Sequence, residues 1–387
     1  MPRYFITLIV SVALFMETMD STIIATSLPA IAADLGEDPI ALKLALTSYL
    51  LSLAVFIPIS GWMADRFGAR TVFRAAIVVF TLGSLACGFA TSLLDFILFR
   101  VVQGIGGAMM VPVGRLVILR SVPKQELISA LAWLTVPALM GPVIGPPLGG
   151  FITTAFDWRW IFWINIPVGL LGVYLASRFI ENFREDKVPP LDLKGFFLSG
   201  IGLAGLAFGF TIIGQPLFPP WVVVSLLAVG VASCTLYVRH ALSIPAPLLD
   251  LRLLKIDTFF ANIAGGFLFR IGVGATPFLL PLYFQLGFGM NPLQSGLLTF
   301  SIAIGAVAMK TAAAPILRRF GYTHVLVWNA LITSAFIAVC ALFTAATPQA
   351  LILVTLLVGG FFRSLEFTAI NTIAYADIGE HEMSKAT

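Results

Sequence analysis

Glu17 and Asp20 are two carboxylates three residues apart inside the first long apolar stretch of the sequence, residues 5–28. Residues three apart share one face of a helix, and at a rise of about 1.5 Å per residue both would lie near the middle of a bilayer. An ionised side chain at that depth costs about 2.5–3.5 kcal/mol on insertion scales, so it usually serves a function. Neighbouring carboxylates in a low dielectric resist simultaneous ionisation. We therefore predict a proton site; the alternative is a structural ion pair with an arginine.

Arg100 is the basic residue best suited to respond to that site. It lies in residues 99–107, Phe-Arg-Val-Val-Gln-Gly-Ile-Gly-Gly, within another apolar stretch. A permanently charged guanidinium can pair with an ionised carboxylate and loses that partner when the carboxylate is protonated. Arg100 is thus predicted to convert protonation into a change of conformation, the alternative being a static buried pair.

Four further basic residues within apolar stretches are candidates for a substrate cavity, where they would suit an anion. They are Arg115, Arg270, Lys310 and Arg363. Arg115 lies near the inner end of its stretch and can equally extend to the membrane surface. Arg363 is expected to pair with Glu366, three residues further on.

Residues 138–150 combine glycine periodicity with proline. Gly141, Gly145 and Gly149 recur every fourth residue, so they form a row along one helical face to which another helix can pack closely. Pro142 and three other prolines, at 137, 146 and 147, remove backbone donors and should bend the helix. The segment is predicted to seal or slide between two moving bodies; static packing explains the spacing equally well.

A short charged connection follows the second apolar stretch. It contains Asp65, Arg66, Gly68 and Arg70. Asp65 could meet a helix amino terminus or an arginine and hold the inner side of the protein closed. The alternative is ordinary helix capping together with positive charge on the cytoplasmic side.

Composition identifies the elements that must position these residues. Of the 387 residues, 59 % are hydrophobic and 11 % charged, and the mean hydropathy is +1.00, which is typical of an all-α polytopic membrane protein.

The three cysteines are isolated and no catalytic motif occurs, so we expect neither an enzyme site nor a metal or cofactor. Twelve spans are predicted, at 5–28, 42–63, 72–92, 95–118, 127–152, 160–180, 194–214, 219–240, 258–284, 294–317, 324–346 and 349–372.

Charge and repetition give the topology of these spans. Of 23 Lys and Arg, five have three or more residues of a predicted span on either side, and the others lie at span ends or in connections. Of these others, Lys43 and Arg159 are on the side of the odd-numbered connections and sixteen are on the side of the chain ends, which places both visible ends in the cytoplasm. Arg-Phe-Gly occurs at 66–68 and again at 319–321, an offset of 253 residues (319 − 66), each time between two spans. Such repeats are typical of transporters built from related halves. The offset predicts fourteen spans: a six-helix bundle at 1–180, a linker region with two extra helices at 181–257, and four of six helices of a second bundle at 258–387.

These motifs together resemble the major facilitator superfamily, in particular its fourteen-span drug:proton antiporter branch. Residues 61–71 resemble the signature of the loop between spans 2 and 3, residues 100–107 the arginine motif of the fourth span, and residues 141–150 the antiporter motif of the fifth. Residues 20–29 and 158–169 are similar to stretches of the branch's first and sixth spans. The resemblance implies a major facilitator fold and alternating access in the bacterial inner membrane. For some members it also implies a periplasmic adaptor and an outer-membrane channel as partners.

The leading hypothesis is a proton-coupled antiporter for multidrug efflux, driven by the proton gradient. Asp20 and Glu17 would take protons, Arg100 would respond to their charge, and residues 141–150 would seal the cavity. Because the interiors of the predicted spans, away from their ends, hold five basic but three acidic residues, export of organic anions such as carboxylates or their metal chelates is an alternative. A non-transporting membrane receptor or scaffold is a second alternative. No nucleic-acid partner is expected, because the excess of Lys and Arg is explained by their distribution on the cytoplasmic side of the spans.

Overall fold

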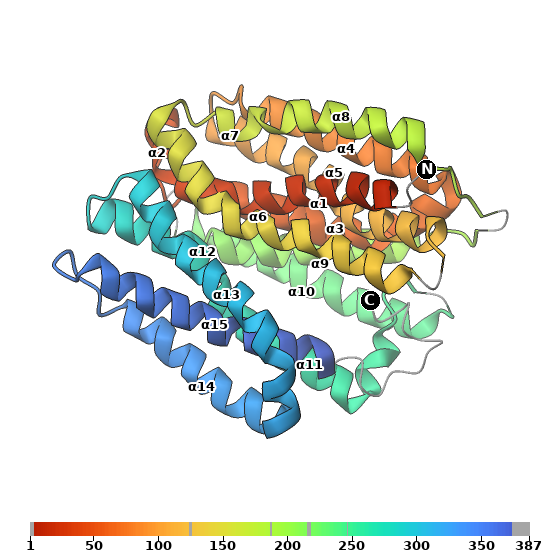
Figure 1. The fold of residues 1–387 in the computed structure, drawn as a ribbon. Coiled ribbons are helices and arrows are strands. Elements are labelled where there is room, and N and C mark those ends of the chain that lie inside the picture. The colour runs from red at the N-terminus through yellow and green to blue at the C-terminus, as the bar shows by residue number, and fades with distance from the viewer. Residues whose placement is uncertain (1–3, 124–125, 186–187, 215–217, 246, 374–387) are drawn as a thin grey trace. The chain divides into compact units, whose positions relative to one another are not determined.

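The computed structural model describes residues 4–123, 126–185, 188–214, 218–245 and 247–373, and these ranges hold helices and connections without a β-strand (Figure 1). The amino-terminal half contains α1 (Tyr4–Ile23), η1 (Ile24–Thr26), α2 (Leu28–Leu35), α3 (Lys43–Phe67), α4 (Ala69–Cys87), α5 (Leu93–Ser121), α6 (Leu127–Ala155), α7 (Trp160–Trp163) and α8 (Asn165–Phe179). The remainder contains α9 (Leu193–Thr211), α10 (Pro220–Ser243), η2 (Leu251–Lys255), α11 (Asp257–Gly274), α12 (Thr276–Leu282), η3 (Tyr283–Gly287), α13 (Pro292–Phe320), α14 (Tyr322–Cys340) and α15 (Gln349–Ile373).

Most of these helices are long and apolar enough to cross a membrane. Eleven such spans occur among the described residues, and they fall on eleven of the twelve predicted ranges. The remaining range, 127–152, falls on α6, which has 29 residues and no charged side chain. The all-α polytopic fold is confirmed, and the predicted count of twelve is approximate. The two chain ends whose location was predicted, residues 1–3 and 374–387, lie outside the described residues.

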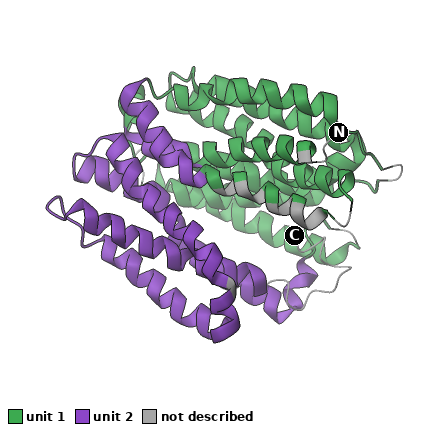
Figure 2. Cartoon of the chain, viewed as in Figure 1, with its two compact units in different colours: residues 1–21, 30–141, 157–250 green, residues 22–29, 142–156, 251–387 purple. Residues whose placement is uncertain are grey.

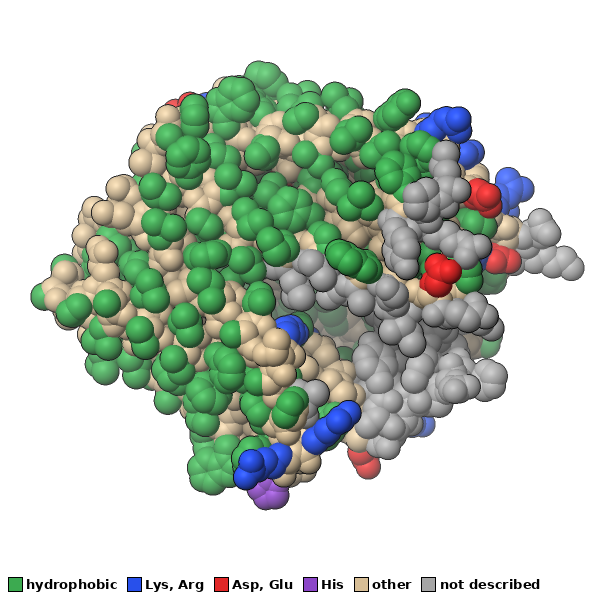
Figure 3. Space-filling view, in the orientation of Figure 1, with side chains coloured by type: hydrophobic (Ala, Val, Ile, Leu, Met, Phe, Trp, Pro, Cys, Tyr) green, Lys and Arg blue, Asp and Glu red, His purple; other side chains and the backbone are tan. Residues whose placement is uncertain are grey.

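The outer surface of the helices is apolar, as lipid contact requires. Large hydrophobic side chains are exposed on helices from both halves of the chain, with Leu170, Trp221 and Trp328 exposed by 65, 70 and 64 %. Figure 3 shows hydrophobic side chains over much of one face, with charged side chains gathered in a few places. The chain is therefore a multi-pass membrane protein.

The chain divides into two compact units (Figure 2). Unit 1 comprises residues 1–21, 30–141 and 157–250, and unit 2 comprises residues 22–29, 142–156 and 251–387. The boundaries cut through α1 and α6, so each of these helices contributes to both units. In unit 1, α5 packs against α3 and α4, α8 against α4, and α9 against α3 and α10. In unit 2, α15 packs against α13, α14 and α11.

Asp192 fixes the start of α9 within unit 1. Its side chain accepts hydrogen bonds from the backbone N–H groups of Gly195 (2.8 Å) and Leu248 (3.3 Å) and contacts Nε2 of His240 at 2.7 Å. Burial alone would raise the pKa of Asp192, but the hydrogen bond with His240 and those from the backbone hold it below its usual value. The end of α10 is thereby attached to the start of α9.

The offset of 253 residues recurs in the structure. Gly68 and Gly321 both adopt positive φ (96° and 73°), and each separates a long helix from one of 19 residues, α4 or α14. A residue with a Cβ is strained at such φ values, which explains why glycine stands at both places.

The helix contacts on either side of that turn follow the same offset. In unit 1, Gly104 of α5 packs on Ser52 of α3. In unit 2 the equivalent positions, Leu357 of α15 and Gly305 of α13, are again in contact, with the glycine now on the other helix. The same pair of positions is thus in contact in α3–α5 and in α13–α15, as an internal repeat requires.

Gly305→Leu should destabilise unit 2, because a Cβ at this position would collide with the backbone oxygen of Leu357 and force α13 away from α15. Overpacking of this kind costs about 1–3 kcal/mol. Gly274→Leu is the matched control, since a Cβ there meets nothing within 4 Å. Thermal unfolding of the detergent-purified protein, followed with a thiol-reactive dye, should show a lower midpoint for the first variant alone. Equal midpoints would contradict the assigned contact.

Candidate functional site

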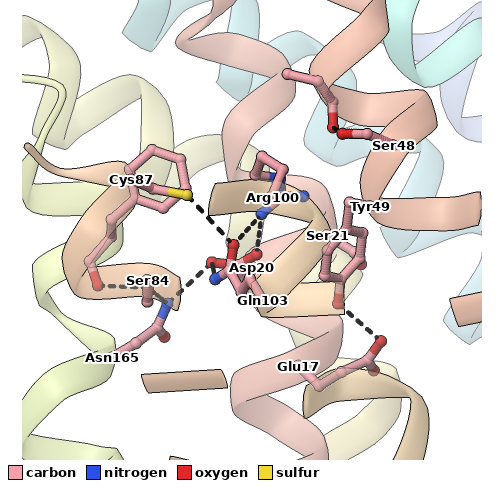
Figure 4. A network of polar contacts seen from close by, with 12 residues as sticks. Glu17, Asp20, Ser21, Ser48, Tyr49, Ser84, Cys87, Arg100, Gln103 and Asn165 are labelled. Atoms are coloured by element: carbon pink, nitrogen blue, oxygen red, sulfur yellow. Dashed lines mark hydrogen bonds and ion pairs between the residues drawn. The ribbon is translucent and has the colours of Figure 1, made fainter. Parts of the chain in front are cut away.

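Asp20 and Arg100 form a buried ion pair between α1 and α5 (Figure 4). Nη1 of Arg100 lies 2.6 Å from Oδ2 of Asp20, and both side chains have no exposed surface. The other oxygen of Asp20, Oδ1, accepts hydrogen bonds from the amides of Gln103 (2.8 Å) and Asn165 (2.9 Å). Two helices, α5 with two donors and α8 with one, thus satisfy a single carboxylate on α1. The predicted proximity of Asp20 and Arg100 is present in the structure.

The pairing of Arg100 is incomplete. Its Nη1 also donates to Oε1 of Gln103 (2.6 Å), whereas Nε and Nη2 are buried without a hydrogen-bond partner in the described protein. The face of the guanidinium lies 4.0 Å from the centre of the Tyr49 ring, a cation–π contact that offsets part of the desolvation. A buried ion pair is favourable only when its geometry is excellent and its remaining donors are satisfied. In the Asp20–Arg100 pair only Nη1 of Arg100 is bonded, and two buried nitrogens have no partner. The pair therefore adds little net stability, although removing either partner alone would be costly.

Glu17 lies one helical turn before Asp20 and has a different environment. It is 7 % exposed, and its Oε1 accepts a hydrogen bond of 3.1 Å from the hydroxyl of Tyr49. Tyr49 therefore contacts Glu17 through its hydroxyl and Arg100, the partner of Asp20, through its ring. In the described structure Arg100 pairs with Asp20, and Glu17 has a neutral partner. The two carboxyl groups thus have different partners within one site.

Small residues allow the helices of the site to approach each other. Gly83 of α4 packs against the backbone of Gln103, and Gly107 of α5 lies beside the Tyr49 hydroxyl and the Glu17 side chain. A side chain at Gly83 would displace Gln103, which donates to Asp20, and a side chain at Gly107 would crowd Tyr49 and Glu17. The glycines in residues 99–107 therefore have a positional role.

Two residues of the site were not predicted from the sequence. These are Asn165, whose amide bonds both to Asp20 and to the Ser84 hydroxyl (2.9 Å), and Tyr49. The signal that the sequence offers for Asn165 is an amide within an apolar stretch, since such a group needs hydrogen-bond partners when it is buried.

The charged connection at 65–70 is held by residues of unit 1. Asp65 pairs with Arg120 at the end of α5 (3.0 Å), and Arg120 also pairs with Glu185 (2.8 Å). Gly68 packs against the side chain of Asn182. Arg66 is exposed, and Arg70 reaches the backbone oxygen of Ile180 at 3.5 Å. Asp65 thus meets an arginine, which is one of the two partners expected for it.

The glycine row of α6 packs along α1 and η1. Within unit 1, Gly141 lies against Thr18 and Met19. Within unit 2, Gly145 packs on Thr22, and Gly149 on Ile23 and Thr26. Pro142, beside Gly141, is exposed. The close backbone approach expected from the spacing is present.

The remaining basic candidates have no carboxylate partner in the described residues. Arg115 and Arg270 are exposed, and Arg270 lies 5.5 Å from the Phe367 ring. Lys310 donates to the hydroxyl of Thr368 (3.3 Å).

The expected pairing of Arg363 with Glu366 is wrong. Glu366 accepts a hydrogen bond from the amide of Asn329 on α14 (2.8 Å), and the described structure contains no ion pair between Glu366 and Arg363. Helical spacing of three placed the two residues on neighbouring positions, but Glu366 points toward α14.

The comparisons with known proteins agree with this architecture. The family model described as Major Facilitator Superfamily matches residues 10–387. The chain belongs to this superfamily. It is 39 % identical over 374 residues to the "Putative multidrug resistance protein MdtD" of Salmonella heidelberg, covering 96 % of this chain and 78 % of the relative. The Escherichia coli protein of the same name is 38 % identical over 374 residues, covering 96 and 79 %.

Solved transporter structures share the fold. The XylE xylose transporter of E. coli matches with a TM-score of 0.65 at 14 % identity, covering 99 % of this chain and 87 % of that one. A POT family transporter in complex with 5-aminolevulinic acid matches with a TM-score of 0.69 at 13 % identity, covering 99 and 85 %. These relatives and neighbours are transporters, so the chain is a secondary transporter of the major facilitator type. They do not support the receptor or scaffold alternative.

A double-mutant cycle should measure the dependence of Asp20 on Arg100. Arg100→Leu leaves a buried carboxylate without its cation and should cost about 3–5 kcal/mol of stability. The double variant Arg100→Leu/Asp20→Leu should recover most of that loss, because neither charge remains. The control is Arg159→Leu, which breaks a partly exposed pair with Asp34 (2.7 Å) and should cost about 1 kcal/mol or less. Thermal unfolding midpoints provide the comparison, and a double variant as unstable as Arg100→Leu would contradict the pairing.

Proposed function

We propose that this transporter is a proton-coupled antiporter that exports small molecules, with multidrug efflux as its function. The observation that carries the proposal is the fully buried Asp20–Arg100 pair, supported by the MdtD relatives. An intramembrane carboxylate paired with a permanent cation has two distinct states, ionised and neutral, and only the ionised state attracts the cation.

Protonation of Asp20 would release Arg100 from its one strong partner. Arg100 has two further nitrogens without hydrogen-bond partners, so it can turn toward other acceptors once the charge on Asp20 is neutralised. Gln103 and Asn165 would remain near the protonated carboxyl group, because an amide can donate to or accept from it. The proposed consequence is a shift of α1 relative to α5, driven by the loss of one charge interaction.

The second half of α6 and the start of α13 supply a candidate seal. Within unit 2, Gly150 packs on the backbone of Pro292, and Gly296 of α13 packs on that of Pro146. The hydroxyl of Thr154 accepts a hydrogen bond from the Leu293 N–H (3.2 Å). These contacts involve backbone rather than long side chains, so they can open and close with little rearrangement. In alternating access this seal would close one side while the Asp65–Arg120–Glu185 cluster opens on the other.

The positive-inside distribution supports placement in the bacterial inner membrane with both visible ends in the cytoplasm. Protons would then enter as substrate leaves, without a cofactor. The resemblance to the drug:proton branch extends the proposal to partners, namely a periplasmic adaptor and an outer-membrane channel.

Asp20→Asn should abolish pH-driven export, because the amide cannot lose a proton. Substrate exchange at equal pH on both sides should be retained, since it needs no net proton movement. Proteoliposomes with an imposed pH gradient and a fluorescent cationic drug provide the measurement. Glu37→Gln is the control, an exposed carboxylate changed to its amide in a loop. Export by Asp20→Asn equal to that of the unchanged protein would remove Asp20 from the mechanism.

Organic anion export is the second candidate, and three basic residues of unit 2 favour it. Arg270 and Lys310 approach α15 at the adjacent residues Phe367 and Thr368, and Arg363 lies one turn earlier on the same helix. None of the three has a carboxylate partner in the described residues. Cations within a membrane bundle that lack a carboxylate are suited to a substrate that carries one.

Lys310→Gln and Arg363→Gln should distinguish the two substrate classes. If an organic anion is the substrate, both variants raise the half-saturating concentration of a tricarboxylate and leave that of a cationic dye unchanged. Lys194→Gln, an exposed residue in the first turn of α9, is the control. Competition between the tricarboxylate and the dye in proteoliposomes provides the readout, and unchanged tricarboxylate handling in both variants would contradict the second candidate.

A further inference from the structure

Glu366 is a buried carboxyl group that the transport mechanism above does not use. It lies on α15 and is 3 % exposed. Its Oε2 accepts a hydrogen bond of 2.8 Å from the amide of Asn329 on α14, which is also 3 % exposed. A charged side chain within a membrane helix normally pairs with an opposite charge, as Asp20 does with Arg100. Glu366 has an amide as its partner instead.

The charged groups around Glu366 do not supply a cation. The helices that pack against α15 are α11, α13 and α14, and their charged side chains are all exposed. These side chains are Asp257, Arg270, Lys310, Arg318, Arg319 and His324. On α15 itself lies Arg363, three residues before Glu366. Within the part of the chain that the structure describes, none of these groups forms an ion pair with Glu366, so none of these pairs offsets a negative charge on it.

The orientation of the Asn329 amide is fixed by two acceptors. Its Nδ2 donates to Oε2 of Glu366 and to the backbone oxygen of Phe362 (2.9 Å). Because a backbone carbonyl can only accept, the nitrogen must face Phe362, and the amide oxygen Oδ1 is the group left over. Oδ1 of Asn329 is buried without a hydrogen-bond partner in the described protein, and so is Oδ1 of Asn262, which borders the same space as Glu366. Amide oxygens that lack a donor therefore surround the carboxyl group.

This polar group stands where unit 1 has an apolar core. Subtracting the repeat offset of 253 from Asn262, Asn329, Thr333 and Glu366 leads to Ile9, Ala76, Phe80 and Val113. All four equivalents belong to the hydrophobic core of unit 1, and each is at most 3 % exposed. The shared scaffold thus does not require polar side chains at these positions. Because buried polar groups are costly in a membrane bundle, their presence in unit 2 indicates a chemical role.

We propose that Glu366 and Asn329 form a proton-binding site in unit 2, separate from Asp20. The proton is bound to Glu366 and is donated in a hydrogen bond to Oδ1 of Asn329. A carboxylic acid and a primary amide complement each other in this way, because the amide N–H donates to one carboxyl oxygen and the acid O–H donates to the amide oxygen. The first of these two bonds is present in the structure. The proton removes the uncompensated charge and gives Oδ1 the donor that it lacks.

Infrared spectroscopy of the purified protein in lipid tests the proposal, because the C=O stretch of a carboxylic acid is separate from the bands of carboxylates. At neutral pH we expect a carboxylic-acid band that Glu17→Gln and Asp20→Asn retain and Glu366→Gln lacks. Glutamine has nearly the shape of glutamic acid and can donate to Asn329 from its own amide, so this variant should fold. Identical spectra of the unchanged protein and Glu366→Gln in this region would overturn the proposal.

Asn329→Ala tests the partner, since it keeps Glu366 and removes the amide. Loss of the hydrogen bond to the carboxyl oxygen should move the carboxylic-acid band to higher frequency. Thr333→Val is the matched control, one turn further along α14, because it removes a buried hydroxyl that has no partner in the described residues. An unmoved band in Asn329→Ala, or an equal shift in Thr333→Val, would overturn the pairing with Asn329.

Thermal unfolding gives a measurement that does not depend on spectral assignment. Raising the pH removes the proton and leaves an unpaired charge in the core, so the unfolding midpoint of the unchanged protein should fall between neutral and alkaline pH. Glu366→Gln has no proton to lose there, and its midpoint should fall less. An equal fall in both proteins would overturn the proposal. None of these readouts depends on transport, so this site and the antiport mechanism can fail separately.

Discussion

The buried pair of Asp20 and Arg100 is the interaction on which the rest of unit 1 depends. A carboxylate and a guanidinium without exposed surface must satisfy each other, because solvent does not reach them. Satisfying Asp20 requires donors from α5 and α8. Gly83 lets α5 approach α4 at Gln103, and Gly169 lets α8 approach α4 at Thr81. The helix packing of unit 1 is thus arranged around one charge. Protonation of Asp20 would remove this charge and so weaken the ion pair with Arg100 around which these helices pack.

Unit 2 shows the same scaffold with different chemistry. α13–α15 reproduce the register of α3–α5, including the glycine at the turn and the close contact between the first and third helix of each set. The positions equivalent to Arg100 and Gln103 are Leu353 and Leu356, so the ion pair has no equivalent there. Its buried acid is instead Glu366, paired with the amide of Asn329. A repeat can therefore preserve backbone contacts while its polar residues move to other positions.

Much of the fold could be predicted from the sequence, because apolar stretches of about 20 residues and the distribution of Lys and Arg are strong signals. The Arg-Phe-Gly repeat also predicted a relation that the helix contacts confirm. Within the site, Asp20 and Arg100 were identified because intramembrane charges are rare. Tyr49 and Asn165 were not identified, since an aromatic or an amide in an apolar helix is common and only tertiary contacts show its partner. The wrong pairing of Arg363 with Glu366 has the same origin: spacing along a helix places two residues near each other but does not determine which neighbouring helix offers a better partner.

The place of Asp20 along α1 connects the site to the seal. Asp20 belongs to unit 1, and two residues later, at Thr22, the same helix enters unit 2. There the chain packs against Gly145 and Gly149 of α6, and the Thr26 backbone oxygen accepts a hydrogen bond from Gln285 (2.9 Å). A helix transmits displacement along its axis because each turn is hydrogen-bonded to the next. A change of charge at Asp20 that shifts α1 by a fraction of an ångström therefore acts within one turn on the segment that contacts α6 and η3. α6 crosses the same unit boundary between Gly141 and Pro142, where proline leaves the helix one hydrogen bond short and less resistant to bending. We infer that α1 carries the proposed signal to α6, which contacts it through the glycine row and through the hydroxyls of Thr26 and Ser27, bonded to the Pro146 backbone oxygen (3.3 Å) and the Thr153 hydroxyl (2.6 Å).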